Sequence, residues 1–204
     1  MGKFIPLNIH SHYSLLYALP KIPELVAEAK KYGLPALALT DNGNLYAAIE
    51  FYKECKKEGV KPILGMHAYM AFRGRGDKQA GVDNRRHRLL LLAKNLQGYR
   101  NLIQLTTRAH LEGFYYRPRI DRELLAEYHE GLIAIAPSFS NDILQSLKLA
   151  NNEQAMERLN WYKKTFNSNL EAWLPSNFFF EVTHHPEIKG HEENMKKIVE
   201  FARK

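Results

Sequence analysis

The sequence lacks the cysteines that a disulfide framework or a thiolate-rich zinc site would require. Cys55 is the single cysteine among 204 residues, which excludes both kinds of site. No apolar run approaches the roughly 20 residues that cross a bilayer. The N-terminus also lacks the charged, apolar and small-residue pattern of a signal peptide. We therefore expect a cytoplasmic protein that makes no membrane contact.

Positive charge is moderately in excess. The formal net charge is +7, with 45% hydrophobic and 25% charged residues, which is typical of a soluble globular chain. Basic residues gather in three clusters, at 53–57, 72–78 and 84–88. Such clusters favour contact with a polyanion such as DNA, although they also serve solubility. We see no repeat or linker, so we expect one domain, residues 1–204.

Short apolar runs alternate with amphipathic stretches along the whole chain, which indicates an α/β fold. The predicted strands are 4–10, 35–40, 61–72, 88–94, 131–136 and 178–183. The predicted helices are 22–32, 44–58, 98–112, 121–130, 141–150, 152–166 and 190–203. Fully apolar strands between helices predict a parallel sheet, open or closed into a barrel. The segment 73–87 is rich in glycine and charge, and we expect it to be a disordered loop.

Polar residues that could bind metal lie at the ends of several predicted strands. His10 and His12 alternate at the end of the first strand, so both would face the same side. Asp41 and Asn42 follow the second strand, and His67 lies within the third. Imidazoles and carboxylates that converge from several strands can hold divalent cations, which activate water for phosphoester hydrolysis. The alternative is that these histidines are hydrogen-bonded core residues.

Two segments combine arginines with features suited to nucleic acid. The stretch 113–121 joins three aromatic residues to Arg117 and Arg119. The cluster 84–88 contains Arg85 and Arg86. Aromatic rings can stack on bases while arginines pair with phosphates. The first stretch can equally be a packed loop whose arginines extend along its surface.

The motifs together resemble a known family. They are FIPLNIHSHYSLL, GLPALALTDNGNLYAAIEFY, GVKPILGMHAYMA, HRLLLLAKNLQGYRNLIQLTTRAHLEGFYYRPRIDRELLAEYHEGLIAIA and FFFEVTHHPE. In this order they resemble the PHP (polymerase and histidinol phosphatase) domain, in the form found at the N-terminus of bacterial DNA polymerase III alpha subunits. The resemblance implies a distorted, TIM-like barrel of about seven strands, truncated here to six because the chain ends after the helix at 190–203.

The resemblance also implies a ligand set. Family members with metal take ligands from an opening H-x-H, a nearby acidic residue or histidine, a T-D-H turn, a G-x-E strand, the histidine of H-L-x-L-L-A, a cysteine after G-L-I-x-L-S and a late D-x-H. We match His10, His12 and His87 to ligand positions. The positions that depart from the pattern, or keep only part of it, are Tyr17, Asp41 with Asn42, His67 and Ser138.

These departures predict a degenerate metal site. An imidazole at position 67 cannot neutralise charge between two cations as a bridging glutamate does, and Tyr17 and Ser138 are poor ligands at neutral pH. No full metal cluster is therefore expected. A single Zn²⁺ or Mn²⁺ held by histidines at 10, 12, 67 and 87 is the most that we expect.

By resemblance, the chain belongs to a replicative polymerase (a nucleotidyltransferase), whose own catalytic residues would lie beyond residue 204. We expect a scaffold and docking role. The implied partners are the remaining polymerase domains, a proofreading exonuclease subunit, and DNA through the parent protein. Two alternatives stay open. One is a metal-dependent phosphoesterase or 3′–5′ exonuclease, and the other is a module that binds single-stranded DNA.

Overall fold

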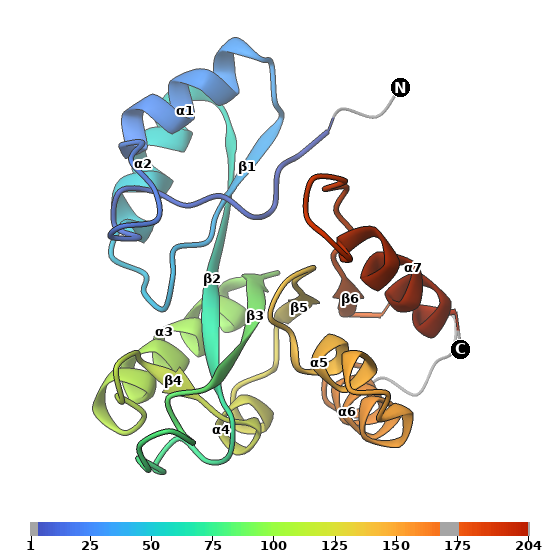
Figure 1. Cartoon of the computed structure of the whole chain (residues 1–204). Helices are drawn as coiled ribbons and strands as arrows, with labels where there is room; N and C mark the ends of the chain where they lie inside the picture. Colours follow the sequence, from blue (N-terminus) through green and yellow to red (C-terminus); the bar gives the residue numbers. More distant parts are fainter. Residues whose placement is uncertain (1–3, 168–175, 204) are drawn as a thin grey trace.

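A computed structural model describes residues 4–167 and 176–203, which form a mixed sheet covered by helices (Figure 1). The strands are β1 (Ala36–Leu39), β2 (Lys61–Ala71), β3 (Arg86–Ala93), β4 (Arg119–Ile120), β5 (Leu132–Ala136) and β6 (Phe178–Phe180). The helices are α1 (Ile22–Lys31), α2 (Ala48–Glu58), α3 (Leu96–Leu111), α4 (Arg122–Glu127), α5 (Asp142–Lys148), α6 (Asn152–Phe166) and α7 (His191–Ala202). Among the described residues no helix is long and apolar enough to cross a membrane.

All seven predicted helices are confirmed, within a few residues at their ends. Local signals explain this agreement. Asn95, Asp121 and Asn141 each accept a hydrogen bond from a backbone N–H of the first helical turn, which satisfies a donor that has no partner within the helix. Gly59 ends α2 in the left-handed conformation at φ 75°, where a side chain would be strained.

The sheet is not entirely parallel, so that part of the prediction is wrong. Its order is β1-β2-β3-β5-β6, and β4 pairs with the edge of β2 opposite β3. β3 runs antiparallel to both β2 and β5, whereas the other neighbouring pairs are parallel. The loop after β2 contains no helix, so the chain turns back directly beside the strand that it has just left. β3 is therefore the one reversed strand of the described sheet.

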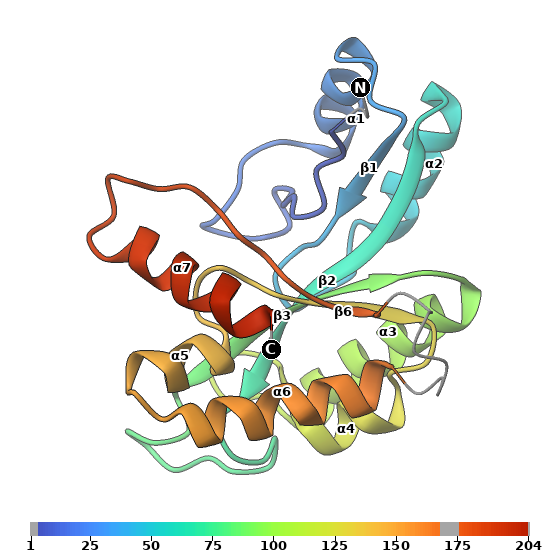
Figure 2. The ribbon, with the colours of Figure 1, turned by 90° about the vertical axis from the view of Figure 1, so that its right-hand side faces the viewer.

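The long strand β2 connects two hydrophobic cores. Its residues Lys61–Leu64 pair with β1, and Gly65–Ala71 pair with β3. A Cβ at Gly65 would lie 2.5 Å from the carbonyl oxygen of Leu91, so this crossing point requires glycine. One core lies between α1, α2 and β1, and a larger core lies under β2, β3 and β5. Figure 2 shows α3, α4, α5 and α6 together beneath the sheet.

The predicted first strand, residues 4–10, is an extended segment without strand pairing. It still lies along β1, because Ala38 N–H donates to Pro6 O over 3.3 Å and Thr40 N–H donates to Ile9 O over 2.8 Å. Two separated backbone bonds do not make a continuous ladder. The count of six strands nevertheless holds, since the two-residue strand β4 was not predicted. The sheet is open, so a closed barrel is not observed among the described strands.

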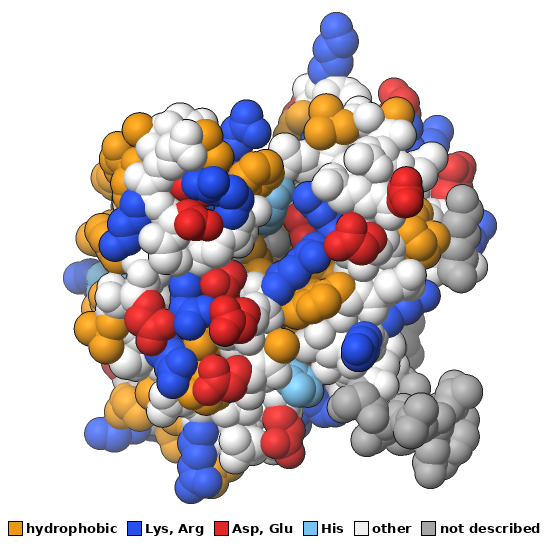
Figure 3. Space-filling model, turned by 90° about the horizontal axis from the view of Figure 1, so that it is seen from below, with side chains coloured by type: hydrophobic (Ala, Val, Ile, Leu, Met, Phe, Trp, Pro, Cys, Tyr) orange, Lys and Arg blue, Asp and Glu red, His pale blue; other side chains and the backbone are white. Residues whose placement is uncertain are grey.

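The loop between β2 and β3 is ordered, contrary to the prediction. Asp83 is buried and accepts hydrogen bonds from Nε and Nη2 of Arg73. Arg119 is 1% exposed and donates to the carbonyl oxygens of Arg75, Asp77 and Asp83 over 2.8–2.9 Å. These bonds satisfy loop carbonyls that a disordered loop would expose to water. In Figure 3, which views the molecule from below, a hollow lies near the centre of this charged face.

Candidate functional site

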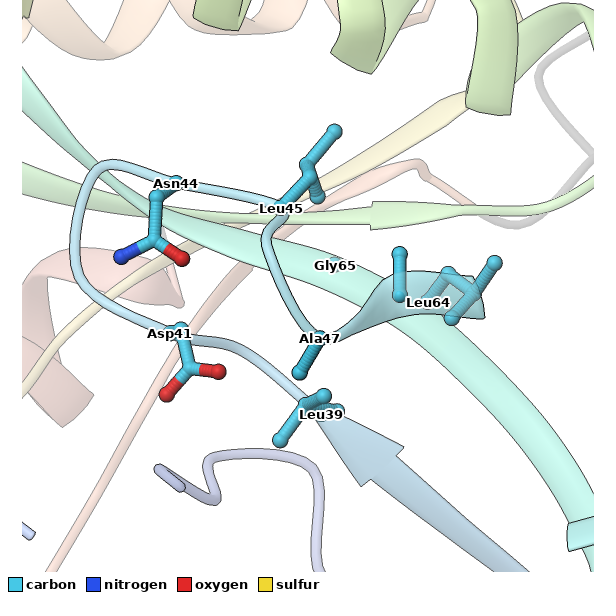
Figure 4. Close-up of a pocket in the computed structure, with 8 residues that line it drawn as sticks. Leu39, Asp41, Asn44, Leu45, Ala47, Leu64 and Gly65 are labelled. Atoms are coloured by element: carbon cyan, nitrogen blue, oxygen red, sulfur yellow. The ribbon is translucent and has the colours of Figure 1, made fainter. Parts of the chain in front are cut away.

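The carboxylate of Asp41 fixes the N-terminal segment against the end of β1. It accepts hydrogen bonds from the backbone N–H and the hydroxyl of Ser11, both over 2.7 Å, and from the hydroxyl of Ser14 over 2.6 Å. Figure 4 shows the Asp41 side chain directed toward the N-terminal segment. The adjoining cavity is about 10 Å³, which has room for one water molecule and no substrate. The observed hydrogen bonds of the Asp41 carboxylate thus all fix the N-terminal segment.

His67, His10 and Arg88 meet beside this turn. The rings of His10 and His67 stack with centroids 5.6 Å apart. Nη1 of Arg88 lies 3.3 Å from Nδ1 of His67 and donates to Oδ1 of Asn42 over 2.9 Å. The turn itself is fixed by backbone bonds, since Gly43 N–H donates to the His67 carbonyl and His67 N–H donates to the Asp41 carbonyl. A positive charge therefore stands in the centre of the cluster.

The contact with Arg88 determines which nitrogen of His67 carries its proton. A guanidinium can only donate, so Nδ1 of His67 must accept and the proton must be on Nε2. Burial, the charge of Arg88 and the neighbouring His10 lower the pKa of His67 to about 3. The ring is therefore neutral, yet neither nitrogen offers a free lone pair. In this arrangement His67 cannot act as a metal ligand.

His87 lies on the opposite face of the sheet from His67. In the β2–β3 ladder His67 pairs with Leu90 and Met70 pairs with His87, and paired residues share a face. Since residues three apart on a strand face opposite sides, His87 points away from the cluster. The six-letter motif H-L-x-L-L-A ends at Ala93, which places its first position at Arg88. On this alignment Arg88, and not His87, lies on the same face of the sheet as His67, and the match of the family histidine to His87 stays a prediction.

A second carboxylate, which the sequence reasoning missed, lies after β6. Glu181 accepts hydrogen bonds from the backbone N–H and the hydroxyl of Ser138, over 2.9 and 3.0 Å, and from Nδ2 of Asn8 over 3.1 Å. It thereby ties together three segments that are far apart in sequence. The signal was a lone acidic residue directly after the apolar run FFF. Ser138, in the position of the family cysteine, is 1% exposed and serves this contact.

The remaining predicted site residues lie at the border of the cluster. His12 packs against its neighbour Tyr13, with ring centroids 4.2 Å apart. Tyr17 is 53% exposed, and the guanidinium carbon of Arg88 lies 5.4 Å from the centre of its ring. Burial lowers the pKa of His10, although the charge of Asp41 opposes this shift.

The donor set does not fit a metal cluster. Among the described residues no three His, Cys, Asp or Glu side chains are grouped so that they could hold a metal ion. Buried side-chain atoms without a hydrogen-bond partner gather here nonetheless, and they are Asn8 Oδ1, His10 Nδ1, His12 Nδ1, Asn42 Nδ2 and His67 Nε2. Such atoms need a small polar partner such as water. Both carboxylates already accept protein hydrogen bonds, and Arg88 supplies positive charge in place of a cation.

The four arginines predicted to contact nucleic acid lie in three different places. Arg119 is buried with its donors bonded to backbone carbonyls, which makes it unavailable to DNA. Arg117 lines a cleft among tyrosines. Arg85 and Arg86 line a different cleft at the start of β3. The sequence grouped Arg117 with Arg119, but alternation along the chain separates their environments.

The chain has relatives among known proteins. Residues 6–185 match the PHP domain family. The chain is 42% identical over 204 residues to DNA polymerase III subunit alpha of Borreliella burgdorferi, a match that covers 99% of this chain and 17% of that protein. It is 41% identical to the same subunit of Thermus aquaticus, over 99% of this chain and 16% of that protein. The chain thus spans about one sixth of the length of these relatives.

A solved structure shares the fold. It is described as a metal-dependent phosphoesterase from Bifidobacterium adolescentis, and it superposes with a TM-score of 0.58 at 13% sequence identity. The match covers 96% of this chain and 82% of that chain. At this identity the likeness concerns the arrangement of helices and strands.

Proposed function

Because this chain belongs to the PHP domain family, we propose that it forms the PHP portion of a bacterial replicative DNA polymerase and acts there as a scaffold without hydrolase activity. Relatives named DNA polymerase III subunit alpha, 41–42% identical over nearly the whole chain, support the first part. The observation that best supports a scaffold without hydrolase activity is the guanidinium of Arg88 beside His67.

Three features of the site support the loss of a multinuclear metal centre. Arg88 repels a cation at the position where the H-L-x-L-L-A motif, aligned to end at Ala93, has a histidine. The same residue leaves His67 without a free lone pair. Asp41 and Glu181, the carboxylates of the site, accept bonds from serines that hold the fold together. A cluster of neighbouring cations needs negative oxygen ligands between them.

A single Zn²⁺ or Mn²⁺ would depend on His10 and His12, because His67 and His87 are not placed to assist. A structural zinc site normally has four protein ligands and a catalytic one has three. Two imidazoles therefore give weak affinity at most. The rival function is a metal-dependent phosphoesterase or 3′–5′ exonuclease. It requires several free metal ligands, including negative oxygen ligands between the cations, which this site lacks.

The scaffold role implies partners outside the chain. The first is the rest of the polymerase, and the second is a proofreading exonuclease subunit, as the family resemblance implies. A cytoplasmic location follows from the same role. Replacing metal by the bonds of Asp41 and Glu181 suits a scaffold, since these bonds hold the N-terminal segment, β1 and the ends of β5 and β6 together.

Elemental analysis tests the proposal. The chain is exposed to excess Zn²⁺ or Mn²⁺, desalted and measured for bound metal, and hydrolysis of bis-p-nitrophenyl phosphate is followed with and without EDTA. We expect metal well below one ion per chain and no EDTA-sensitive hydrolysis. Two or more ions per chain, with hydrolysis that is lost in His10→Ala, would overturn the scaffold proposal.

The scaffold role has a separate readout. The chain and the polymerase lacking this segment are produced separately and mixed, and the complex is analysed by gel filtration and thermal unfolding. Co-elution with an increase in the unfolding temperature of the polymerase is the expected result. Independent elution with unchanged stability would contradict the role.

A further inference from the structure

Unpaired arginines line a cleft at the start of β3. The cleft has a volume of about 430 Å³, and its lining consists of Asn84, Arg85, Arg86, His87, Arg88, Ser140 and Gln145. No carboxylate belongs to this described lining. By contrast, Arg73 and Arg75 in the neighbouring loop form ion pairs with Asp83 and Asp121. The positive charge at Arg85 and Arg86 is therefore free to attract an anion.

Aromatic rings hold these arginines in place from one side. The guanidinium carbon of Arg85 lies 5.4 Å from the ring centre of Phe72, and that of Arg86 lies 5.5 Å from the ring centre of Tyr69. Stacking uses the flat face of a guanidinium and leaves N–H groups at its edges. Arg86 gives one of these to the carbonyl oxygen of Asn84 over 2.9 Å. The other edge groups suit the oxygens of a phosphate.

His87 is a buried polar residue in the lining of the same cleft. Its side chain is 7% exposed, and its ring contacts Phe72 with centroids 6.0 Å apart. It lines this cleft and also an adjoining cleft, whose lining includes the carboxylates of Asp142 and Glu157. The view from below shows Lys, Arg and His side chains around the central hollow, with Asp and Glu side chains among them (Figure 3).

A tyrosine cleft adjoins the arginine cleft through Tyr69. It has a volume of about 150 Å³, and its lining includes Tyr13, Tyr17, Tyr46, Tyr69, His110 and Arg117. Tyr46 is 66% exposed, and its ring meets that of Tyr13 edge to face. An exposed tyrosine ring in an open cleft can stack on a nucleobase. Phosphate-binding and base-stacking features thus lie side by side.

We infer that the arginine cleft binds the phosphodiester backbone of a single-stranded nucleic acid and that a base of the same strand rests in the tyrosine cleft. This goes beyond the proposed scaffold function and does not depend on the state of the metal site. Acidic protein segments would satisfy the arginines but would leave the tyrosine cleft without a stacking partner. A duplex keeps its bases stacked inside, so its bases could not reach the tyrosines.

Binding of fluorescent oligo(dT) to the 204-residue chain tests the inference, measured by anisotropy at several salt concentrations. In the double variant R85Q/R86Q we expect the affinity to fall about tenfold at low salt. We expect the slope of log affinity against log salt to lessen by about 1.4, since each phosphate contact on a single strand contributes about 0.7. Arg100, exposed on α3, supplies the matched control. R100Q should keep both the affinity and most of the slope.

The tyrosine cleft has its own variant. Y46A should weaken oligo(dT) binding about tenfold with an unchanged salt slope, because it removes a stacking ring and no charge. Y46F should bind like the wild type. This difference in slope separates the base contact from the phosphate contacts.

Four results would overturn the inference. These are unchanged binding in R85Q/R86Q, an equal loss in R100Q, equal binding of a duplex of the same length, and equal binding of polyglutamate. Circular dichroism of each variant checks that it is folded. Binding of oligo(dT) with this pattern would support the inference whatever the elemental analysis finds. Failure of the scaffold proposal would appear in the metal content instead.

Discussion

Arg88 on β3 donates a hydrogen bond to Nδ1 of His67 on β2 over 3.3 Å, across the antiparallel ladder of the two strands. When the H-L-x-L-L-A motif of the family resemblance is aligned to end at Ala93, its histidine falls on Arg88. An arginine at this position has two consequences. It introduces a positive charge that repels cations, and it uses the lone pair by which the neighbouring imidazole could bind one.

Replacing Arg88 by histidine should restore part of a metal site. R88H removes the charge, releases Nδ1 of His67 and adds an imidazole on the side of the sheet that His10 faces. We expect the affinity for Zn²⁺ to rise at least about tenfold over the wild type, on the scale of ligand-sphere changes in metalloproteins. Competition with a chromophoric zinc chelator measures it.

Two further variants interpret that result. R88Q removes the charge without adding a ligand, so it should bind Zn²⁺ less tightly than R88H. The double variant R88H/H67N should lose most of the gain. Equal affinities in R88H and R88Q would show that repulsion alone, and not ligand number, limits the site.

The lowered pKa of His67 predicts a dependence of stability on pH. Its pKa is about 3 in the folded protein, against 6.5 for the ordinary side chain. Above pH 6.5 the ring is neutral in both states and contributes nothing. As the pH falls below 6.5 the unfolded chain takes up a proton that the folded chain refuses. The free energy of unfolding should therefore fall, by roughly 2 kcal/mol at pH 5.

The variant H67N isolates this contribution, because asparagine keeps an acceptor for Arg88 but does not titrate. Urea unfolding at pH 7.5 and pH 5 should show a smaller pH effect in H67N than in the wild type. His10 and His87, whose pKa values burial also lowers, should leave a residual effect in the same direction. An identical pH effect in both proteins would contradict a depressed pKa at His67.

Much of the fold could be predicted from local sequence signals, and the errors have a common cause. The helices follow from apolar spacing and caps such as Asn95 and Asp121. Strand direction depends on what joins the strands in space. Arg119, which is distant in sequence, holds the loop after β2 by hydrogen bonds to its carbonyl oxygens. The order of this loop and the reversal of β3 could therefore not be predicted from the composition of the loop.

In the candidate site, too, some residues could be predicted from local sequence and others depend on contacts between distant segments. Residues at the ends of apolar runs, such as His10 and Asp41, could be found from their positions. The choice between His87 and Arg88 depends on strand register, in which a shift by one residue changes the face of the sheet. Glu181 could be identified only after β6 was placed beside β5, which brings it to Ser138.

The buried carboxylate of Asp41 should be important for stability. D41N removes the charge and replaces one acceptor oxygen by a donor group facing Ser11 and Ser14. We expect a loss of about 3 kcal/mol in the free energy of unfolding, measured by urea denaturation. The exposed carboxylate of Glu123 is the control, and E123Q should change stability by less than about 0.5 kcal/mol. Equal effects of the two variants would contradict a structural role for Asp41.

Arg119 should determine the order of the loop between β2 and β3. Its guanidinium donates to four carbonyl oxygens, those of Arg75, Asp77, Asp83 and Gly113. Lysine has three donors on a single atom and cannot reach carbonyls on different sides. R119K should therefore lower the free energy of unfolding by about 3 kcal/mol and increase proteolytic cleavage within the loop. R117K, two residues away in the tyrosine cleft, should change neither property. If the loop of R119K resisted protease as well as that of the wild type, other contacts, such as that of Arg73 with Asp83, would have to hold it.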